Sequence, residues 1–168
     1  MIMQQRDACD EKVGLFVNKY PEFKEFMARW VKLLVLQQEV QAGLKFPDVQ
    51  NFAWTEEEFI GGVPLATKLP LQLFAEPFRL SAAKMGSQLA EIFPPLGESI
   101  DRLQKRLEDD TWSAQCLAAV VNGDAAALAA AASSVDISAE ILLFYVRVVY
   151  SPCAKALRPL LEQHPSVV

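Results

Sequence analysis

The longest apolar stretch of the chain runs from residue 141 to 161, and it limits what the protein can fold into. Between Ile141 and Tyr150 the only charged residue is Arg147. A helix that is apolar all round is buried among other helices. Ser151-Pro152 is typical of a helix start, so we expect two nearly collinear helices over 139–150 and 152–163. The sequence thus predicts an all-α bundle of about seven to nine helices around a central C-terminal apolar helix.

Composition narrows the class of protein further. The chain has 168 residues, of which 52% are hydrophobic, and this predicts a single helical domain over 1–168. A net charge of −5 without a basic run argues against nucleic acid as a partner. Arg147 and Lys155 interrupt the best candidate for a membrane span. An N-terminus without an apolar signal region and three scattered cysteines indicate the cytoplasm.

Helical periodicity recurs along most of the chain. A first helix is predicted over 7–19 and a second from Pro21 to about Ala42. The second carries an apolar stripe that we expect to be buried, made of Phe23, Phe26, Met27, Trp30, Val31 and Leu34. Helices resume at about Arg79. Capping residues mark later helix ends, namely Asp109, Gly123, Asp124 and Ser138.

Residues 44–78 break this regularity. Four prolines and Gly61-Gly62 forbid one long helix there, yet the segment is rich in aromatic and aliphatic residues. A long apolar segment of this kind lies either on the bundle or against a partner. In the first case Trp54 and Phe59 only cover the bundle, and in the second they are anchors for a bound protein.

The residues offer no reactive centre. One histidine, His164, and no C-x-x-C pair give no metal site, and no glycine loop suits a phosphate. Cys153 would lie in the first turn of a helix, where the helix dipole lowers a thiol pKa. No base is within reach of it, and a buried apolar filler is the other interpretation. The sequence therefore predicts a protein that is not an enzyme and holds no cofactor.

Arg147 is the third candidate for a functional residue. A charge inside an apolar run needs a partner or a path to water. It either pairs with a carboxylate, reaches the surface, or contacts a protein partner or an anionic ligand in a cleft. The last option leaves a helical small-molecule (anion) binding protein, or a general interaction scaffold, as the alternative function.

Several segments in succession resemble the N-terminal helical domain of the formate dehydrogenase accessory (FdhE-like) proteins. They are Phe26 to Val40, the proline-containing segment Gly62 to Leu71, Trp112 to Ala132, and Leu142 to Leu161. In that family a cysteine-rich, rubredoxin-like part with C-x-x-C pairs follows the helical domain. This sequence departs from the pattern at that point, so the family's metal binding does not carry over to it.

The resemblance implies a cytoplasmic maturation factor without catalytic activity of its own. Such proteins bind the catalytic subunit of a molybdenum or tungsten formate dehydrogenase, in the manner of a chaperone. The expected partner is therefore that subunit, and the expected contact residues are Trp54, Phe59 and Arg147.

Overall fold

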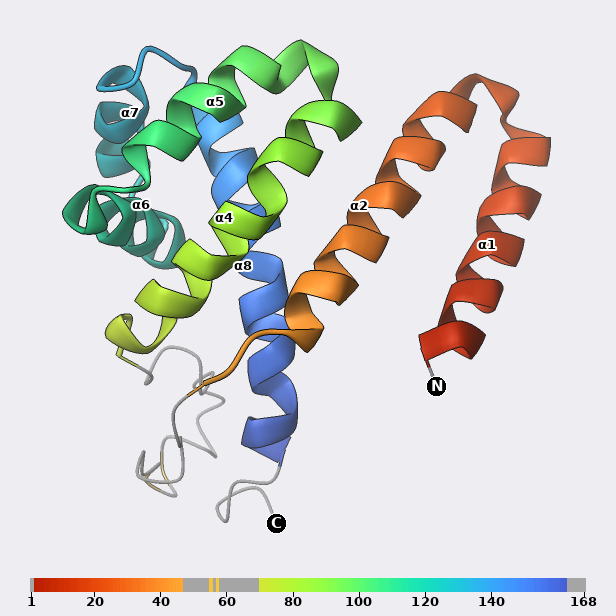
Figure 1. The fold of residues 1–168 in the computed structure, drawn as a ribbon, viewed down its shortest axis with the longest axis horizontal. Helices are drawn as coiled ribbons and strands as arrows, with labels where there is room; N and C mark the ends of the chain where they lie inside the picture. Colours follow the sequence, from red (N-terminus) through yellow and green to blue (C-terminus); the bar gives the residue numbers. More distant parts are fainter. Residues whose placement is uncertain (1, 47–54, 56, 58–69, 163–168) are drawn as a thin grey trace. The chain divides into compact units, whose positions relative to one another are not determined.

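The described part of the chain is entirely helical. The computed structural model describes residues 2–46, 55, 57 and 70–162, and the side chains of 11–46, 55, 57 and 70–159 (Figure 1). These residues form seven α-helices and two 3₁₀ helices, and they contain no strand, which confirms the all-α prediction. The elements are α1 (Ile2–Lys19), η1 (Pro21–Phe23), α2 (Lys24–Ala42), α4 (Gln72–Ile92), η3 (Pro94–Leu96), α5 (Gly97–Arg106), α6 (Asp110–Asn122), α7 (Ala125–Ser133) and α8 (Ala139–Glu162).

The chain divides into two compact units. Unit 1 covers Met1–Leu36 and contains α1, η1 and the first part of α2. Unit 2 covers Gln37–Val168 and contains the end of α2 and the remaining helices. A single domain over the whole chain stays a prediction.

The core of unit 2 is built around α8, as the apolar stretch predicts. The helices α4, α6 and α7 pack against α8, and α5 packs against α4 (Figure 1). The side chains that α8 buries share its inner face and are Leu142, Tyr145, Val146, Val148, Val149, Cys153 and Leu157. They meet the predicted stripes of the neighbouring helices, including Met85, Leu89, Ile100 and Leu103, all almost fully buried. This burial supplies the main stabilising free energy of the unit.

The predicted break at Ser151-Pro152 is wrong, because α8 continues through Pro152 to Glu162. A proline inside a helix removes one hydrogen bond and leaves the carbonyl four residues earlier without its donor. Here that carbonyl belongs to Val148, and the side chain of Gln37 donates to it at 2.9 Å. The next carbonyl, of Val149, accepts from the hydroxyl of Ser81 at 2.7 Å. The donor from Gln37 thus compensates for Pro152, and the Ser81 bond adds a second link between α4 and α8 at the same turn.

The helix predicted from Arg79 begins seven residues earlier, at Gln72. Pro77 lies inside α4, where its ring is buried beside Phe74 and Phe78. The proline falls in the second turn, so only the carbonyl of Leu73 loses its helical donor. Burial of the two phenylalanine rings outweighs this loss. The other predicted features of 44–78 that involve residues 47–54, 56 and 58–69 lie outside the described residues.

The predicted caps are confirmed. The Asp109 carboxylate accepts from the N–H groups of Thr111 and Trp112 at 3.0 and 3.1 Å, which begins α6. Gly123 ends that helix with a φ of 68°, a left-handed conformation that favours glycine. The carboxylate of Asp124 then accepts from the N–H of Ala127 at 2.9 Å and begins α7. Ser138 likewise accepts from the N–H of Ile141 at 3.3 Å.

In unit 1 the apolar stripe of α2 is not buried as predicted. Phe23, Phe26 and Trp30 are exposed, whereas Met27, Val31 and Leu34 are half-buried. The reason is geometric: α1 and α2 meet at η1 and diverge from it, so α1 covers little of the stripe (Figure 1). Periodicity identified the helix correctly, but it does not determine what covers the apolar face.

Candidate functional site

The three residues predicted to bind a partner are not brought together among the described residues. Trp54 and Phe59 lie outside the described part of the chain. Arg147 lies on the outer side of α8 and is exposed, between the buried Val146 and Val148. The Arg147 side chain thus reaches water, and its predicted contact with a partner stays a prediction.

Two hollows lie on either side of α6 in unit 2. The first has a volume of about 560 Å³ and lies between α6 and α7, where alanine side chains form its floor and Trp112 part of its wall. The second has a volume of about 550 Å³ and lies between the first turns of α4 and α6. Gln115 and Ala118 line both hollows, so the exposed side of α6 forms a ridge between them.

Polar side chains and alanines line the first hollow. The first is lined by Arg106, Trp112, Gln115, Asn122, Asp124, Ser134 and five alanines. Its cation, Arg106, is 3.4 Å from the carboxylate of Asp109, and the Asp124 carboxylate is occupied as the cap of α7. The indole N–H of Trp112 donates to the hydroxyl of Ser134 at 3.1 Å. These polar groups are engaged in structural contacts, and none forms a nucleophile–base pair.

The anion-binding alternative depended on a cleft beside Arg147. Neither hollow includes Arg147, which is exposed. An exposed arginine is well hydrated and holds an anion weakly. The anion-binding alternative therefore stays a prediction.

Cys116 and Cys153 behave as buried apolar side chains. Cys153 is fully buried in the interior of α8, and Cys116 is fully buried in α6. Burial raises the pKa of each thiol to about 12, because the thiolate would lose its hydration. This agrees with the filler interpretation of Cys153 and not with a lowered thiol pKa.

A partly buried polar cluster joins α4, α5 and α8. The side-chain amide of Gln104 donates to the carbonyl of Ala82 at 3.0 Å and to the hydroxyl of Tyr145. Burial raises the pKa of Tyr145, so this hydroxyl stays protonated. Gly86 lies directly against the Gln104 side chain. The cluster fixes the packing of three helices, and its polar groups satisfy one another.

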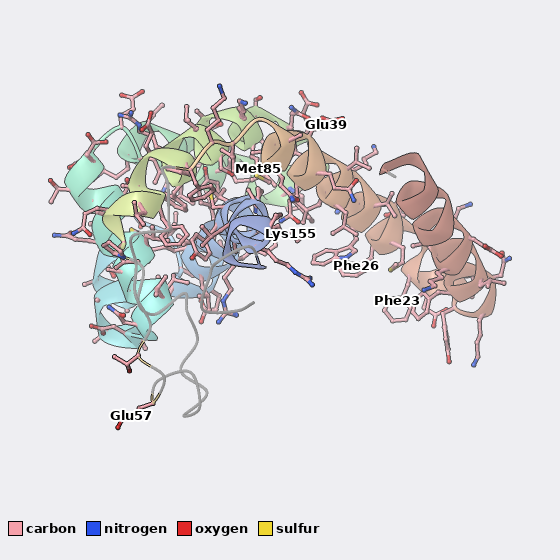
Figure 2. The ribbon with its side chains drawn as sticks, turned by 90° about the horizontal axis from the view of Figure 1, so that it is seen from below. Phe23, Phe26, Glu39, Glu57, Met85 and Lys155 are labelled. Carbon is pink, nitrogen blue, oxygen red and sulfur yellow. The ribbon has the colours of Figure 1, made fainter. Side chains whose placement is uncertain are left out.

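Most of the exposed large apolar side chains in the described part of the chain are in unit 1, and the sequence did not reveal their exposure. Leu15, Phe16, Tyr20, Phe23, Phe26 and Trp30, here called the aromatic face, are between 38% and 66% exposed. The Phe16 ring centroid is 5.0 Å from that of Tyr20 and 5.9 Å from that of Phe23. Phe26 stacks on Trp30 at 6.1 Å. Figure 2 shows Phe23 and Phe26 projecting from the same side of the ribbon.

The described residues show neither a metal-binding cluster nor a helix that could cross a membrane. Residues 2–46, 55, 57 and 70–162 contain no group of three or more His, Cys, Asp or Glu side chains placed to hold a metal ion. Within the same residues no helix is both long enough and apolar enough to cross a lipid bilayer.

Comparisons of the chain with protein-family models, curated proteins and solved structures give no match. They neither support nor contradict the resemblance to the FdhE-like accessory proteins.

Proposed function

We propose that this protein is a non-catalytic accessory factor that binds the catalytic subunit of a formate dehydrogenase during its maturation. The proposal combines the ordered resemblance to the FdhE-like helical domain with one structural observation. That observation is the pair of hollows on either side of α6. The segment Trp112 to Ala132, which resembles the family, forms most of the wall of the first hollow.

The surface around α6 has the properties of a site for a polypeptide. Small side chains, namely Ala114, Ala118, Ala127 and Ala130, leave room for a client backbone to approach closely. Gln115 is an exposed amide that can donate to and accept from peptide groups. An extended or helical segment of a client can place side chains in both hollows at once, with the ridge of α6 between them.

Binding to purified formate dehydrogenase catalytic subunits tests this proposal, with biolayer interferometry as the readout. Gln115→Arg places a long cation between the two hollows and should weaken binding tenfold or more. Gln88→Arg is the matched control, because Gln88 is also exposed and helical but lies on α4 away from both hollows. It should bind like the wild type.

Two results would overturn the proposal. One is retention of the dehydrogenase subunit no better than that of an unrelated protein of similar charge. The other is equal binding by the Gln115→Arg and Gln88→Arg variants, which would show that the α6 surface is not the binding site. Arg147→Glu, Trp54→Ser and Phe59→Ser belong in the same series, since the sequence predicted contacts at these positions.

A further inference from the structure

The helices of unit 1 have little packing of their own. Among the described residues α1 contacts mainly η1, which follows it directly in the chain, and it diverges from α2 (Figure 1). A helix of 18 residues draws most of its stability from packing an apolar face, because helix formation alone is marginal in water. Leu15 and Phe16 on α1 are nevertheless exposed. Within unit 1, the described residues therefore leave much of this apolar face uncovered.

The aromatic face is large enough for a stable protein interface. An aromatic side chain presents roughly 150–250 Å², so at their exposed fractions the six side chains leave roughly 400–700 Å² uncovered. The apolar stems of neighbouring lysines extend this area. A standard interface buries about 800 Å² on each partner, which is close to what the face and its rim provide.

The charges around the face favour a second copy as the occupant. Unit 1 contains six Lys and Arg residues and five Asp and Glu residues. Unit 2 contains ten Lys and Arg residues and sixteen Asp and Glu residues. Two nearly neutral surfaces meet without net repulsion, while two copies of unit 2 would repel each other. Both signs alternate beside the aromatic rings, at Lys19, Glu22, Lys24 and Glu25, all exposed. A two-fold axis can then place a lysine of one copy opposite a glutamate of the other.

These charges also argue against a lipid surface as the occupant. Binding to anionic lipid needs a clear excess of Lys and Arg on the polar side of the helix. Unit 1 has an excess of only one positive charge. Lys19 is moreover held above the ring of Tyr20, with its Nζ 5.3 Å from the ring centroid, within the aromatic face itself.

We infer that the aromatic face of unit 1 is a homodimer interface. The two helices of one copy pack on the two helices of another, and the four form a bundle around a two-fold axis. The rings of Phe16, Phe23, Phe26 and Trp30 fill its centre, and the lysines and glutamates lie at its rim. This assembly gives α1 the apolar cover that the described residues of unit 1 do not provide.

Sedimentation velocity of the full chain from 1 to 500 μM tests this inference. The wild type should be a dimer over most of this range, and Phe23→Ser combined with Phe26→Ser should raise the dimer Kd about 100-fold or more. Leu80→Ser is the matched control, since Leu80 is also exposed, at 42%, but lies on α4 in unit 2. It should leave the Kd unchanged.

A wild type that stays monomeric at 500 μM would overturn the inference. So would a doubly substituted variant that still dimerises, or a Leu80→Ser variant that does not. Phe26→Arg is a second, single substitution at a side chain that is already 55% exposed, and it should also abolish the dimer without unfolding the chain. Client binding is scored separately on the Gln115 variants, so failure of one proposal is distinguishable from failure of the other.

Discussion

The side-chain amide of Gln37 donates a 2.9 Å hydrogen bond to the carbonyl of Val148, four residues before Pro152. In an uninterrupted helix this carbonyl would accept from the N–H of residue 152, which proline lacks. The Oε1 atom of Gln37 lies 3.5 Å from Nζ of Lys155, on the next turn of α8, and this contact orients the amide. Gln37 therefore substitutes for the missing helical donor and attaches the end of α2 to the centre of α8.

Gln37→Ala should lower the free energy of unfolding by about 1–3 kcal/mol, because it leaves a buried carbonyl without a donor. Gln38→Ala is the control, since Gln38 is the exposed neighbour on the same helix and should change stability by less than about 0.5 kcal/mol. Urea denaturation followed by circular dichroism measures both. Equal stability of the two variants would show that the bond to Val148 contributes nothing.

The role of Pro152 can be measured with a double-mutant cycle. Pro152→Ala restores an N–H group that can bond to the carbonyl of Val148. In this background the decrease in the free energy of unfolding caused by Gln37→Ala should be smaller by about 1 kcal/mol or more, because the carbonyl no longer depends on Gln37 for a donor. Strictly additive effects of the two substitutions would contradict the link between them.

Gly86→Ala should destabilise the chain by about 1–3 kcal/mol, although alanine has the higher helix propensity. A Cβ atom at this buried position would collide with the Gln104 side chain, which is held by Tyr145 and Ala82. Thermal unfolding measures the change. Gly97→Ala is the control because a Cβ atom there meets open space. Adding Gln104→Ala should recover part of the loss, and no recovery would rule out this collision as the cause.

Stability should fall in alkaline solution because of the buried thiols. Folding raises the pKa of Cys116 and Cys153 from 9.0 to about 12, so the folded state favours the neutral thiol. This contribution is fully present below pH 9 and is lost as the pH rises from about 9 toward 12. Urea midpoints between pH 7 and 11 should decline less steeply for the double variant Cys116→Ala and Cys153→Ala. Equal decline in both proteins would assign the effect to other groups.

Local features of the fold followed from the sequence. The caps at Asp109, Asp124 and Ser138 depend on side chains within three residues of the N–H groups that they bind, so sequence position alone determines them. The same is true of Gly123, which provides the left-handed turn after α6. The central position of α8 followed from an apolar pattern too wide for one buried stripe.

The candidate site could not be predicted in the same way. The α6 surface depends on how α4 and α7 lie on either side of Gln115 and Ala118, and neither residue carries a signal of its own. Likewise, Phe26 and Trp30 have the spacing of buried residues, yet they are exposed because α1 diverges from α2. Apolar periodicity shows that a face needs a cover, and it does not identify the cover.

The sequence by itself determined the helical class, the ends of α6 and the start of α7, and the apolar helix at the centre of unit 2, because these depend on contacts within one or two turns. Only the tertiary structure decided that α8 passes unbroken through Pro152, since the replacement donor comes from Gln37, 111 residues away along the chain from the carbonyl that it binds. The ring of a proline determines which helical hydrogen bond is lost. Whether that carbonyl gains a replacement donor depends on which distant side chains fold against the helix.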